Sequence, residues 1–346
     1  MLFRSDRGVR LLHSHEATEL LACDGAVVGV RCTGPDGGAV DLDGTVILAT
    51  GAHDWSAELS RRFTGIPPED GGSVAPDSIS GDAIGLVEPV GGTVAALPAW
   101  AAPVLPGYQL SVPAFEGDTG YRACYEHCLP HTFLVNRAGA RFCDDSFHSR
   151  IVAAALSLDD VGRPANLPIF MIWDSRHHQR YGLGATMPGK PYPDGLVAQA
   201  PTLAGVATEL GVDPEGLERT AARFNEHARA GDDPDYGRGS NLSVRRFRGD
   251  GTNEPNPCVA PVEVSPFFGM RIRLLNTGIA AAGVRAGAFG RAQREDGSTI
   301  PGLYAIGECS TRAAAGVGYN SGYSLSRALA FGRLAALDVA RGGAAG

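Results

Sequence analysis

The sequence lacks an excess of positive charge, a long apolar run and an N-terminal targeting segment. Its 346 residues include 30 Lys and Arg against 38 Asp and Glu, so the formal net charge is −8, which excludes a generally basic nucleic-acid binder. No stretch approaches the ~18 uninterrupted apolar residues of a membrane helix. Residues 1–7 contain neither the apolar core nor the cleavage signature of a secretory signal, so secretion is not expected.

The sequence also lacks a paired-cysteine framework. Its seven cysteines are an odd, scattered set, which argues against a disulfide scaffold and for a reducing compartment, the cytoplasm. Cys124 and Cys128 lie near His127 and His131, but this spacing is not that of a paired zinc knuckle, and no second cysteine pair follows at a suitable distance. We therefore expect no bound metal.

The composition is that of a globular protein with many turns. Hydrophobic residues make up 44% of the chain and charged residues 20%, which is enough apolar material for a core. The 47 glycines and 23 prolines favour a fold with many tight turns and close backbone approaches, as nucleotide-binding folds have.

The first fifty residues are expected to form strands. Short or alternating apolar runs predict strands at residues 9–12, 26–33 and 40–43. Residues 45–49 are continuously apolar after the first position, which is typical of a strand buried on both faces.

The strand at 45–49 runs into Thr50 and Gly51. Small residues at the carboxyl end of a buried strand let a ligand approach the backbone, and such crevices are where α/β sheets bind nucleotides. An ordinary strand-to-turn junction is the alternative interpretation.

Two helices are expected next. The first spans residues 56–63, and the second begins at Ser80-Gly81-Asp82 and is stopped by Pro89. The carboxylate of Asp82 near a helix N-terminus is stabilised by the helix dipole. Simple capping is the alternative role for this residue.

Residues 96–262 differ in character and are interpreted as an inserted domain. A hairpin is predicted at 133–142, with its turn at 136–139. A helix is predicted to begin at Asp213-Pro214 and to end before Gly231, because apolar residues recur at helical spacing between them.

The last eighty residues carry two further candidate site segments. A buried strand at 302–307 leads to Glu308, whose carboxylate can accept hydrogen bonds from polyol hydroxyls or simply occupy a surface turn. The final helix, roughly 321–340, follows a glycine-rich loop that includes Gly318 and Gly322. Free N–H groups of its first turn suit an anion or an electron-rich carbonyl. A glycine-rich loop with a Ser N-cap is the alternative.

Together these segments resemble the FAD-dependent dehydrogenases of the fumarate reductase / 3-ketosteroid Δ1-dehydrogenase superfamily. The resemblance runs in order along nearly the whole chain. It covers the family's strand ending in ATG, its G-D-G/A helix start, its V-N-R-x-G-x-R-F and D-x-D-F-G-R segments and its late G-L-Y-A-I-G-E strand. In this sequence the matching residues are 46–55, 81–84, 135–142, 233–238 and 301–308. Residues 256–261 and 266–268 resemble the ketosteroid branch in particular.

The resemblance implies an α/β fold. Residues 1–95 and 263–346 would form the remainder of a Rossmann-like FAD-binding domain, and residues 96–262 an inserted α+β cap, or substrate, domain. The family begins with a strand, a G-x-G-x-x-G/A turn and a helix that hold the FAD pyrophosphate. Nothing like that motif occurs before Val9. The chain is therefore expected to be an N-terminally truncated product, a fragment or one half of a split protein.

FAD is the cofactor that the resemblance implies. The residues that match flavin-binding motifs are Thr50, Gly51, Asp82, Gly307, Glu308, Gly322, Ser324 and Leu325. All of them except Asp82 are expected to converge on one crevice.

Departures from the family's motifs favour a ketone substrate over a dicarboxylate. Tyr319 stands where the fumarate reductase branch has an Arg proton donor, and residues 278–283 lack that branch's His. In the ketosteroid branch a Tyr and a following Gly bind the substrate ketone. Tyr319 and Gly322 are similar, with a spacing one residue shorter. That branch's Tyr base in the cap is missing here, and His148 is the obvious nearby base.

The implied activity is a 3-ketosteroid Δ1-dehydrogenase-type desaturation of a CH–CH bond next to a ketone. A base removes the α-proton, the flavin takes the β-hydride, and donors polarise the ketone. The expected partners are a ketone or enone substrate, for which a steroid is one candidate, and an external electron acceptor. The alternatives are a reductase like the flavoprotein of fumarate reductase or succinate dehydrogenase, and an inactive fragment that does not hold FAD alone.

Overall fold

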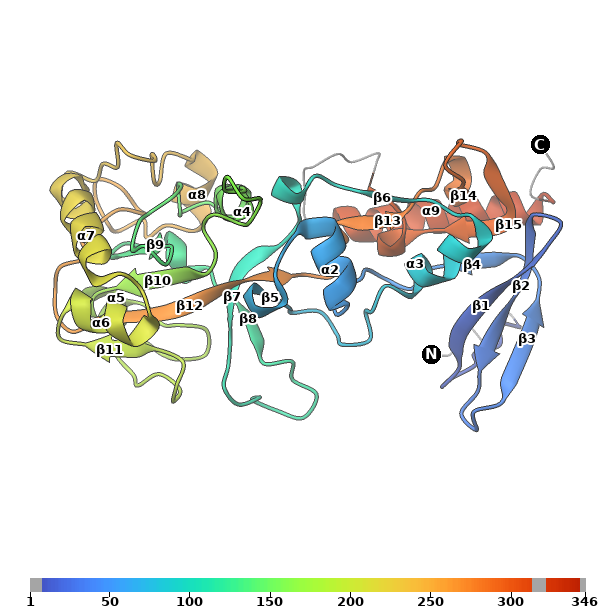
Figure 1. The fold of residues 1–346 in the computed structure, drawn as a ribbon, viewed down its shortest axis with the longest axis horizontal. Helices are drawn as coiled ribbons and strands as arrows, with labels where there is room; N and C mark the ends of the chain where they lie inside the picture. The colour runs from blue at the N-terminus through green and yellow to red at the C-terminus, as the bar shows by residue number, and fades with distance from the viewer. Residues whose placement is uncertain (1–7, 313–321, 343–346) are drawn as a thin grey trace. The chain divides into compact units, whose positions relative to one another are not determined.

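The computed structural model describes residues 8–312 and 322–342, drawn as a ribbon in Figure 1. The chain divides into two compact units, which are described separately. The first unit comprises Met1–His53, Ile79–Ala96 and Ala282–Gly346. The second unit comprises Asp54–Ser78 and Leu97–Ala281.

The first unit contains an antiparallel sheet of β1 (Glu16–Cys23), β2 (Ala26–Thr33) and β3 (Ala39–Asp43), seen in blue in Figure 1. The β1–β2 turn is Asp24-Gly25, with φ of 49° and 78°. Asp-Gly is a strong signal for such a turn, because both residues tolerate positive φ. The apolar pattern alone does not predict β1, whereas this Asp-Gly pair is the local signal for it.

The strand predicted at residues 9–12 is wrong. These residues are irregular and exposed, and no described strand pairs with them. An apolar run this short becomes a strand only when a neighbour satisfies its backbone groups.

A second sheet of the first unit carries the candidate segments at Thr50 and Glu308. Its order is β14 (Arg291–Gln293), β15 (Thr299–Ala305), β4 (Val46–Leu48). Strands β15 and β4 are parallel. The expectation that β4 is buried on both faces is wrong, since Ile47 is 38% exposed. Within the described residues, β15 is the only strand beside β4, and little covers the outer face of Ile47.

Two helices and a strand pair complete the first unit. Helix α3 (Asp82–Val87) ends where predicted, and Pro89 lies in a 3-10 turn after it. Helix α9 (Tyr323–Ala340) is the predicted final helix. Strands β6 (Val94–Ala96) and β13 (Ala282–Val284) pair antiparallel. No helix in the described residues is long and apolar enough to cross a bilayer.

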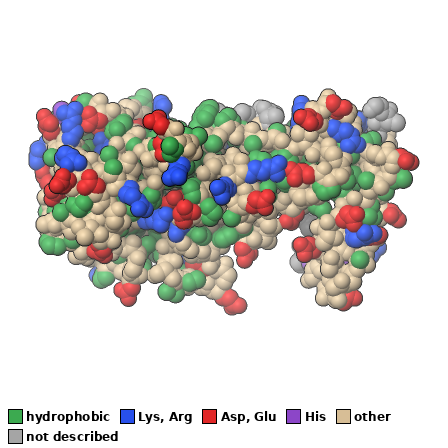
Figure 2. All heavy atoms as spheres, viewed as in Figure 1, with side chains coloured by type: hydrophobic (Ala, Val, Ile, Leu, Met, Phe, Trp, Pro, Cys, Tyr) green, Lys and Arg blue, Asp and Glu red, His purple; other side chains and the backbone are tan. Residues whose placement is uncertain are grey.

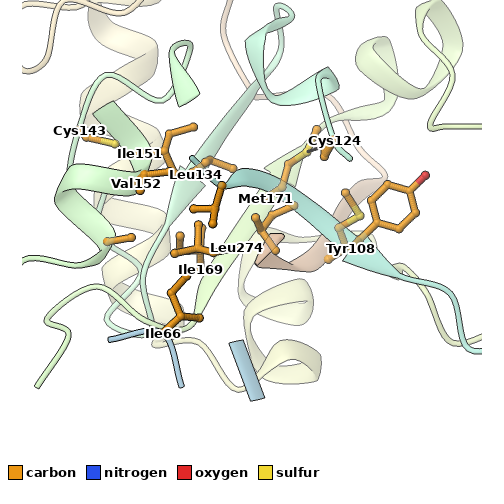
Figure 3. Packing of buried hydrophobic residues seen from close by; sticks show 14 of the residues in the cluster. Ile66, Tyr108, Cys124, Leu134, Cys143, Ile151, Val152, Ile169, Met171 and Leu274 are labelled. Atoms are coloured by element: carbon orange, nitrogen blue, oxygen red, sulfur yellow. Dashed lines mark hydrogen bonds between the residues drawn. The ribbon is translucent and has the colours of Figure 1, made fainter. Parts of the chain in front are cut away.

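The second unit is built on the ten-residue strand β12 (Phe267–Asn276). Its sheet has the order β8-β7-β12-β10-β9, and β11 and β5 also pair with β12. The bounds are β5 (Gly71–Ser73), β7 (Leu105–Gln109), β8 (Tyr121–Ala123), β9 (Thr132–Val135), β10 (Ile169–Trp173) and β11 (Ala198–Ala200). Figure 3 shows the main core, in which Leu134, Met171 and Leu274 from three strands meet Ile151.

The helices of the second unit include two that sequence analysis predicted. The six are α2 (Ala57–Thr64), α4 (His148–Ala155), α5 (Ser175–Arg180), α6 (Leu203–Leu210), α7 (Pro214–Ala228) and α8 (Leu242–Phe247). In α2 the Ser56 hydroxyl accepts from the Leu59 N–H, and in α7 the Asp213 carboxylate accepts from the Glu215 N–H. Both predicted helices are confirmed, because their capping signals act locally.

The compact units differ from the predicted domain boundaries in two segments. Residues 54–78 and 263–281 group with the second unit. The reason is β12, since β5 pairs with it in parallel and three antiparallel strands pair along it. The division into an FAD-binding domain and a cap stays a prediction.

The hairpin predicted at 133–142 is wrong in its second half. After β9 the chain turns, and Arg141 enters a buried charge network instead of a strand. Arg141 donates to both carboxylate oxygens of Asp233 at 2.8 Å and pairs with Asp145 at 3.2 Å. Arg238, whose side chain is fully buried, pairs with Asp145 at 2.6 Å. Two cations and two carboxylates thus neutralise each other inside the unit.

Some of the other ion pairs are exposed. Arg31 bridges Glu19 and Asp41 across the three-stranded sheet, at 2.7 Å to each. Figure 2 shows basic and acidic side chains interspersed over the visible face. Such pairs contribute only about 0–1 kcal/mol each, so removing one partner of an exposed pair should cost less than removing one partner of the buried network.

We expect the second unit to lose stability as pH falls from 6.5 toward 4. Burial lowers the pKa of His127 and of His177 to about 4. Below pH 6.5 the unfolded chain binds protons at these residues while the folded chain does not, so unfolding becomes easier. Each histidine contributes up to about 1.4 kcal/mol per pH unit in this window.

Chemical denaturation at several pH values between 4.5 and 7.5 measures this slope. The matched variant is His177→Asn, whose amide N–H replaces the Nδ1 donor to the Pro130 carbonyl, 2.8 Å away, without titrating. A flat profile for the unaltered chain, or an equal slope in the variant, contradicts the assignment to His177.

Candidate cofactor site

The site begins where two parallel strands end side by side. In the β4–β15 pair, Leu48 is opposite Ala305, so Thr50 and Gly307 each follow their strand by two residues. The Ile306 N–H donates to the Leu48 carbonyl at 3.0 Å, which keeps the two strand ends together. The structure therefore brings the Thr50-Gly51 segment and the Gly307-Glu308 segment to the same edge of the sheet, where α/β folds bind ligands.

The N-terminal half of α9 packs against the second of these segments. A Cβ placed on Gly307 would lie 3.6 Å from the Cβ of Ala328, and Arg327 pairs with Glu308 at 3.2 Å. The helix starts after Gly322, which has φ of 84°. Its first turn therefore directs free N–H groups and the positive end of the dipole to this region.

Two buried hydroxyls at this site are unsatisfied. Thr50 Oγ1 and Ser324 Oγ have no hydrogen-bond partner among the described residues. A buried polar atom without a partner costs free energy, so a polar ligand that hydrogen-bonds both hydroxyls would explain why they are unsatisfied here. Gly51 and Gly307 have φ of 83° and 63°, which only glycine adopts freely, and both leave the backbone open. These features fit part of a large polar cofactor rich in hydroxyls and carbonyls.

The remaining predicted cofactor residues have different surroundings. Asp82 is the exposed first residue of α3, where it accepts a hydrogen bond from the Ser80 hydroxyl. Ile79, just before α3, lies next to Gly51, with 3.6 Å between its Cγ2 and a Cβ placed there. Leu325 is 68% exposed in the first turn of α9. Whether Asp82 and Leu325 contact a cofactor stays a prediction.

The predicted catalytic residues fall in different parts of the chain. Tyr319 lies outside the described residues. Gly322 belongs to the first unit and His148 to the second. His148 is the first residue of α4, is exposed and packs edge-on against Phe147. Desolvation by neighbouring atoms, and then the charge of Arg248, lower its pKa, so it is neutral and able to accept a proton at pH 7.

The cysteine and histidine cluster gives no metal site. Within residues 8–312 and 322–342, no three His, Cys, Asp or Glu side chains are placed to hold a metal ion. Cys128 Sγ donates to the Ser146 carbonyl at 2.9 Å, and burial raises its pKa to about 12. It is therefore a packed thiol.

Arg327 and Cys309 also lie at this site, although no motif in the sequence predicts them there. Arg327 lies on the face of α9 that also buries Ala335 and Asp338. An arginine among small and apolar residues at helical spacing was the available signal. Cys309 Sγ lies 3.2 Å from the Leu48 carbonyl and 3.1 Å from the Ile306 carbonyl, beneath the two strand ends.

Comparisons with known proteins identify the family of the chain. A family described as an FAD binding domain matches residues 2–325. The 4-oxocyclohex-2-ene-1-carboxylate 5-dehydrogenase of Sinomonas cyclohexanicum is 31% identical over 97% of this chain and 58% of its own length. The 3-oxosteroid 1-dehydrogenase of Mycobacterium tuberculosis is 31% identical over 85% of this chain and 52% of its own length. The chain spans about half the length of these curated relatives.

Solved structures show the same fold. The 3-ketosteroid Δ1-dehydrogenase of Sterolibacterium denitrificans, solved with 1,4-androstadiene-3,17-dione, has a TM-score of 0.80 and 24% identity over 95% of this chain and 59% of its own. A flavocytochrome c3 fumarate reductase has a TM-score of 0.60 and 17% identity over 94% of this chain and 52% of its own. The predicted α/β fold class and the predicted cofactor, FAD, are confirmed. The chain belongs to the FAD-binding family that includes the fumarate reductases and 3-ketosteroid dehydrogenases.

Proposed function

We propose that this protein is an FAD-dependent dehydrogenase that removes two hydrogens from a CH–CH bond next to a ring ketone. The observation that supports the proposal most is the convergence of two strand ends and the start of α9, with two unsatisfied hydroxyls, in a member of an FAD-binding family. Relatives 31% identical to the chain are dehydrogenases of oxo compounds.

The proposed substrate class is a six-membered ring that carries a ketone. The names of the two relatives have this element in common, because one acts on an oxocyclohexene carboxylate and the other on a 3-oxosteroid. Beyond the ketone-bearing ring the two substrates differ, because a steroid adds apolar rings whereas the small ring acid carries a charged carboxylate. The ketone-bearing ring is therefore the part of the substrate that the proposal specifies.

The residues of the first unit would hold the cofactor by distinct means. The helix-start N–H groups near Gly322 and Ser324 favour electron-rich oxygens, and the carboxylate of Glu308 accepts from hydroxyls. Thr50 Oγ1 supplies a further polar contact, and Gly51 and Gly307 leave room for the backbone to approach. Bound FAD would supply the acceptor for the hydride.

The proposed chemistry on the substrate needs a base and an oxygen-stabilising pair. Removing the α-proton develops negative charge on the ketone oxygen, so donors directed at that oxygen lower the barrier. We assign this role to the Tyr319 hydroxyl and the Gly322 N–H, and the role of base to His148. An external electron acceptor then returns the cofactor to its oxidised form.

The function is tested by assaying flavin-loaded protein with an artificial electron acceptor. We expect turnover with 4-oxocyclohexanecarboxylate or with a 3-oxosteroid, and none with succinate. Turnover of succinate or reduction of fumarate, without activity on either ketone, would favour the dicarboxylate branch instead. A flavin-loaded protein inactive on all of these compounds would overturn the proposal.

We expect this 346-residue chain by itself to bind FAD weakly. The sequence contains no G-x-G-x-x-G turn, and that turn with its helix offsets the charge of the pyrophosphate. Purified chain should therefore carry well under one FAD per protein in its absorption spectrum. Stoichiometric yellow protein would show that the described site holds FAD without this motif.

A further inference from the structure

Helix α9 buries a cation on its inner face while it exposes leucines. The side chain of Arg327 is 4% exposed, whereas Leu325 and Leu329 are each 68% exposed. Burying a guanidinium is costly unless charge and hydrogen bonds compensate for the lost water. The groups that contact Arg327 must therefore compensate for this cost, and they indicate what the residue does.

One guanidinium binds four oxygens within five residues. Arg327 Nη2 pairs with Glu308 Oε1 at 3.2 Å and donates to the Gly307 carbonyl at 2.8 Å. Arg327 Nη1 donates to the Thr311 carbonyl at 2.9 Å and lies 3.3 Å from the Ser310 carbonyl. All four acceptors belong to residues 307–311, the segment that follows β15 at the cofactor site.

The four oxygens can lie close together only because the Arg327 cation offsets their mutual repulsion. Three carbonyl dipoles and a carboxylate that point at one place repel one another, and the Glu308 side chain is only 12% exposed. Water therefore does little to screen them. The planar, forked geometry of Arg satisfies several acceptors at once, which the single ammonium of Lys does not.

We propose that Arg327 is the positioning residue that orients Glu308 and holds segment 307–311 for recognition of the cofactor's hydroxyl groups. This inference rests on the proposed function for its ligand. A carboxylate held in one orientation before binding loses less conformational entropy when it accepts a hydroxyl. Arg327 thus acts on the cofactor through Glu308.

The far end of α9 offers a matched control. Asp338 pairs with Arg291 in a two-point contact, at 2.7 and 2.8 Å, and accepts from the Tyr304 hydroxyl at 2.7 Å. This pair also ties α9 to the sheet, but within the described residues neither Arg291 nor Asp338 makes a hydrogen bond or ion pair with segment 307–311. Arg291→Met therefore weakens the helix attachment without removing the cation from Glu308.

The test compares Arg327→Met and Arg327→Lys with Arg291→Met in the full chain. The first readout is amide hydrogen exchange of residues 305–312 without cofactor. We expect roughly tenfold faster exchange in Arg327→Met, an intermediate rate in Arg327→Lys and the original rate in Arg291→Met. The second readout is FAD titration by flavin fluorescence, in which only the Arg327 variants should weaken binding, again by roughly tenfold.

The two readouts separate the two proposals. If the unaltered chain binds FAD too weakly to titrate, as the missing G-x-G-x-x-G turn predicts, hydrogen exchange alone decides whether Arg327 holds segment 307–311. Unchanged exchange in Arg327→Met, or an equal effect of Arg291→Met on this segment, would overturn the inference. If Arg327→Met does not fold, Arg327→Lys decides by the same criterion.

Discussion

Replacing Arg238 with Met will lower the free energy of unfolding of the second unit by about 3–5 kcal/mol, the usual cost of breaking a buried ion pair. The Arg238 side chain is fully buried and pairs with Asp145 at 2.6 Å. Its other N–H groups donate to the carbonyls of Cys258, His127 and Leu129 at 2.7–2.9 Å. Met fills similar volume but leaves a buried carboxylate and three carbonyls without this donor.

The same substitution will make the contribution of Asp145 to the stability of the unit less sensitive to acid. Burial alone would raise the pKa of Asp145, but Arg238 and Arg141 outweigh burial and lower it to about 2. Without Arg238 this pKa rises, so the protonated, uncharged form appears at higher pH. A higher folded-state pKa reduces the stability that Asp145 loses on protonation, so denaturation at pH 5 and pH 3 should show a smaller loss of stability in Arg238→Met than in the unaltered chain.

Arg223→Met is the matched control for Arg238→Met. Arg223 pairs with Asp235 at 3.0 Å, but its side chain is 54% exposed. Its loss should cost no more than about 1 kcal/mol. Urea denaturation followed by tryptophan fluorescence measures both variants, since Trp173 lies in the core of the same unit. Equal effects of the two substitutions would contradict a dominant role for the buried network.

Replacing Tyr319 with Phe will lower the turnover of a ketone substrate by about 10²–10³-fold, the typical cost of losing one donor to a developing oxyanion. Phe keeps the ring and removes only the hydroxyl, so the loss should fall on kcat rather than on flavin binding. The measurement is steady-state turnover with an artificial electron acceptor, in protein loaded with FAD to the same level.

Tyr323→Phe is the control for hydroxyl loss in the same stretch of chain. Tyr323 is the first residue of α9, and its ring lies 5.9 Å from the Arg327 guanidinium. We assign its hydroxyl no role, so turnover should stay close to that of the unaltered enzyme. If Tyr319→Phe also keeps full turnover and flavin, the Tyr319 hydroxyl has no catalytic role and the ketone is held elsewhere.

Local signals in the sequence determined several elements of this protein. Helix α7 was predictable because Asp213 and Pro214 mark its start and apolar residues repeat at helical spacing after them. The two strand ends at Thr50 and Gly307 were recognisable because small residues follow apolar runs. Such signals act within about four residues, the reach of a cap or a helical turn, so no knowledge of the chain path is needed.

Only the tertiary structure decided which distant residues meet. The local sequence predicts Arg141 in a hairpin, but its partner Asp233 is 92 residues away, and this pairing prevails over a local strand. Likewise, the apolar pattern of β4 did not reveal that Ile47 would be exposed, because exposure depends on what lies beside the sheet. The contact of Arg327 with Glu308 arises in the same way, since α9 must fold back on the end of β15 before a helix residue meets the cofactor site.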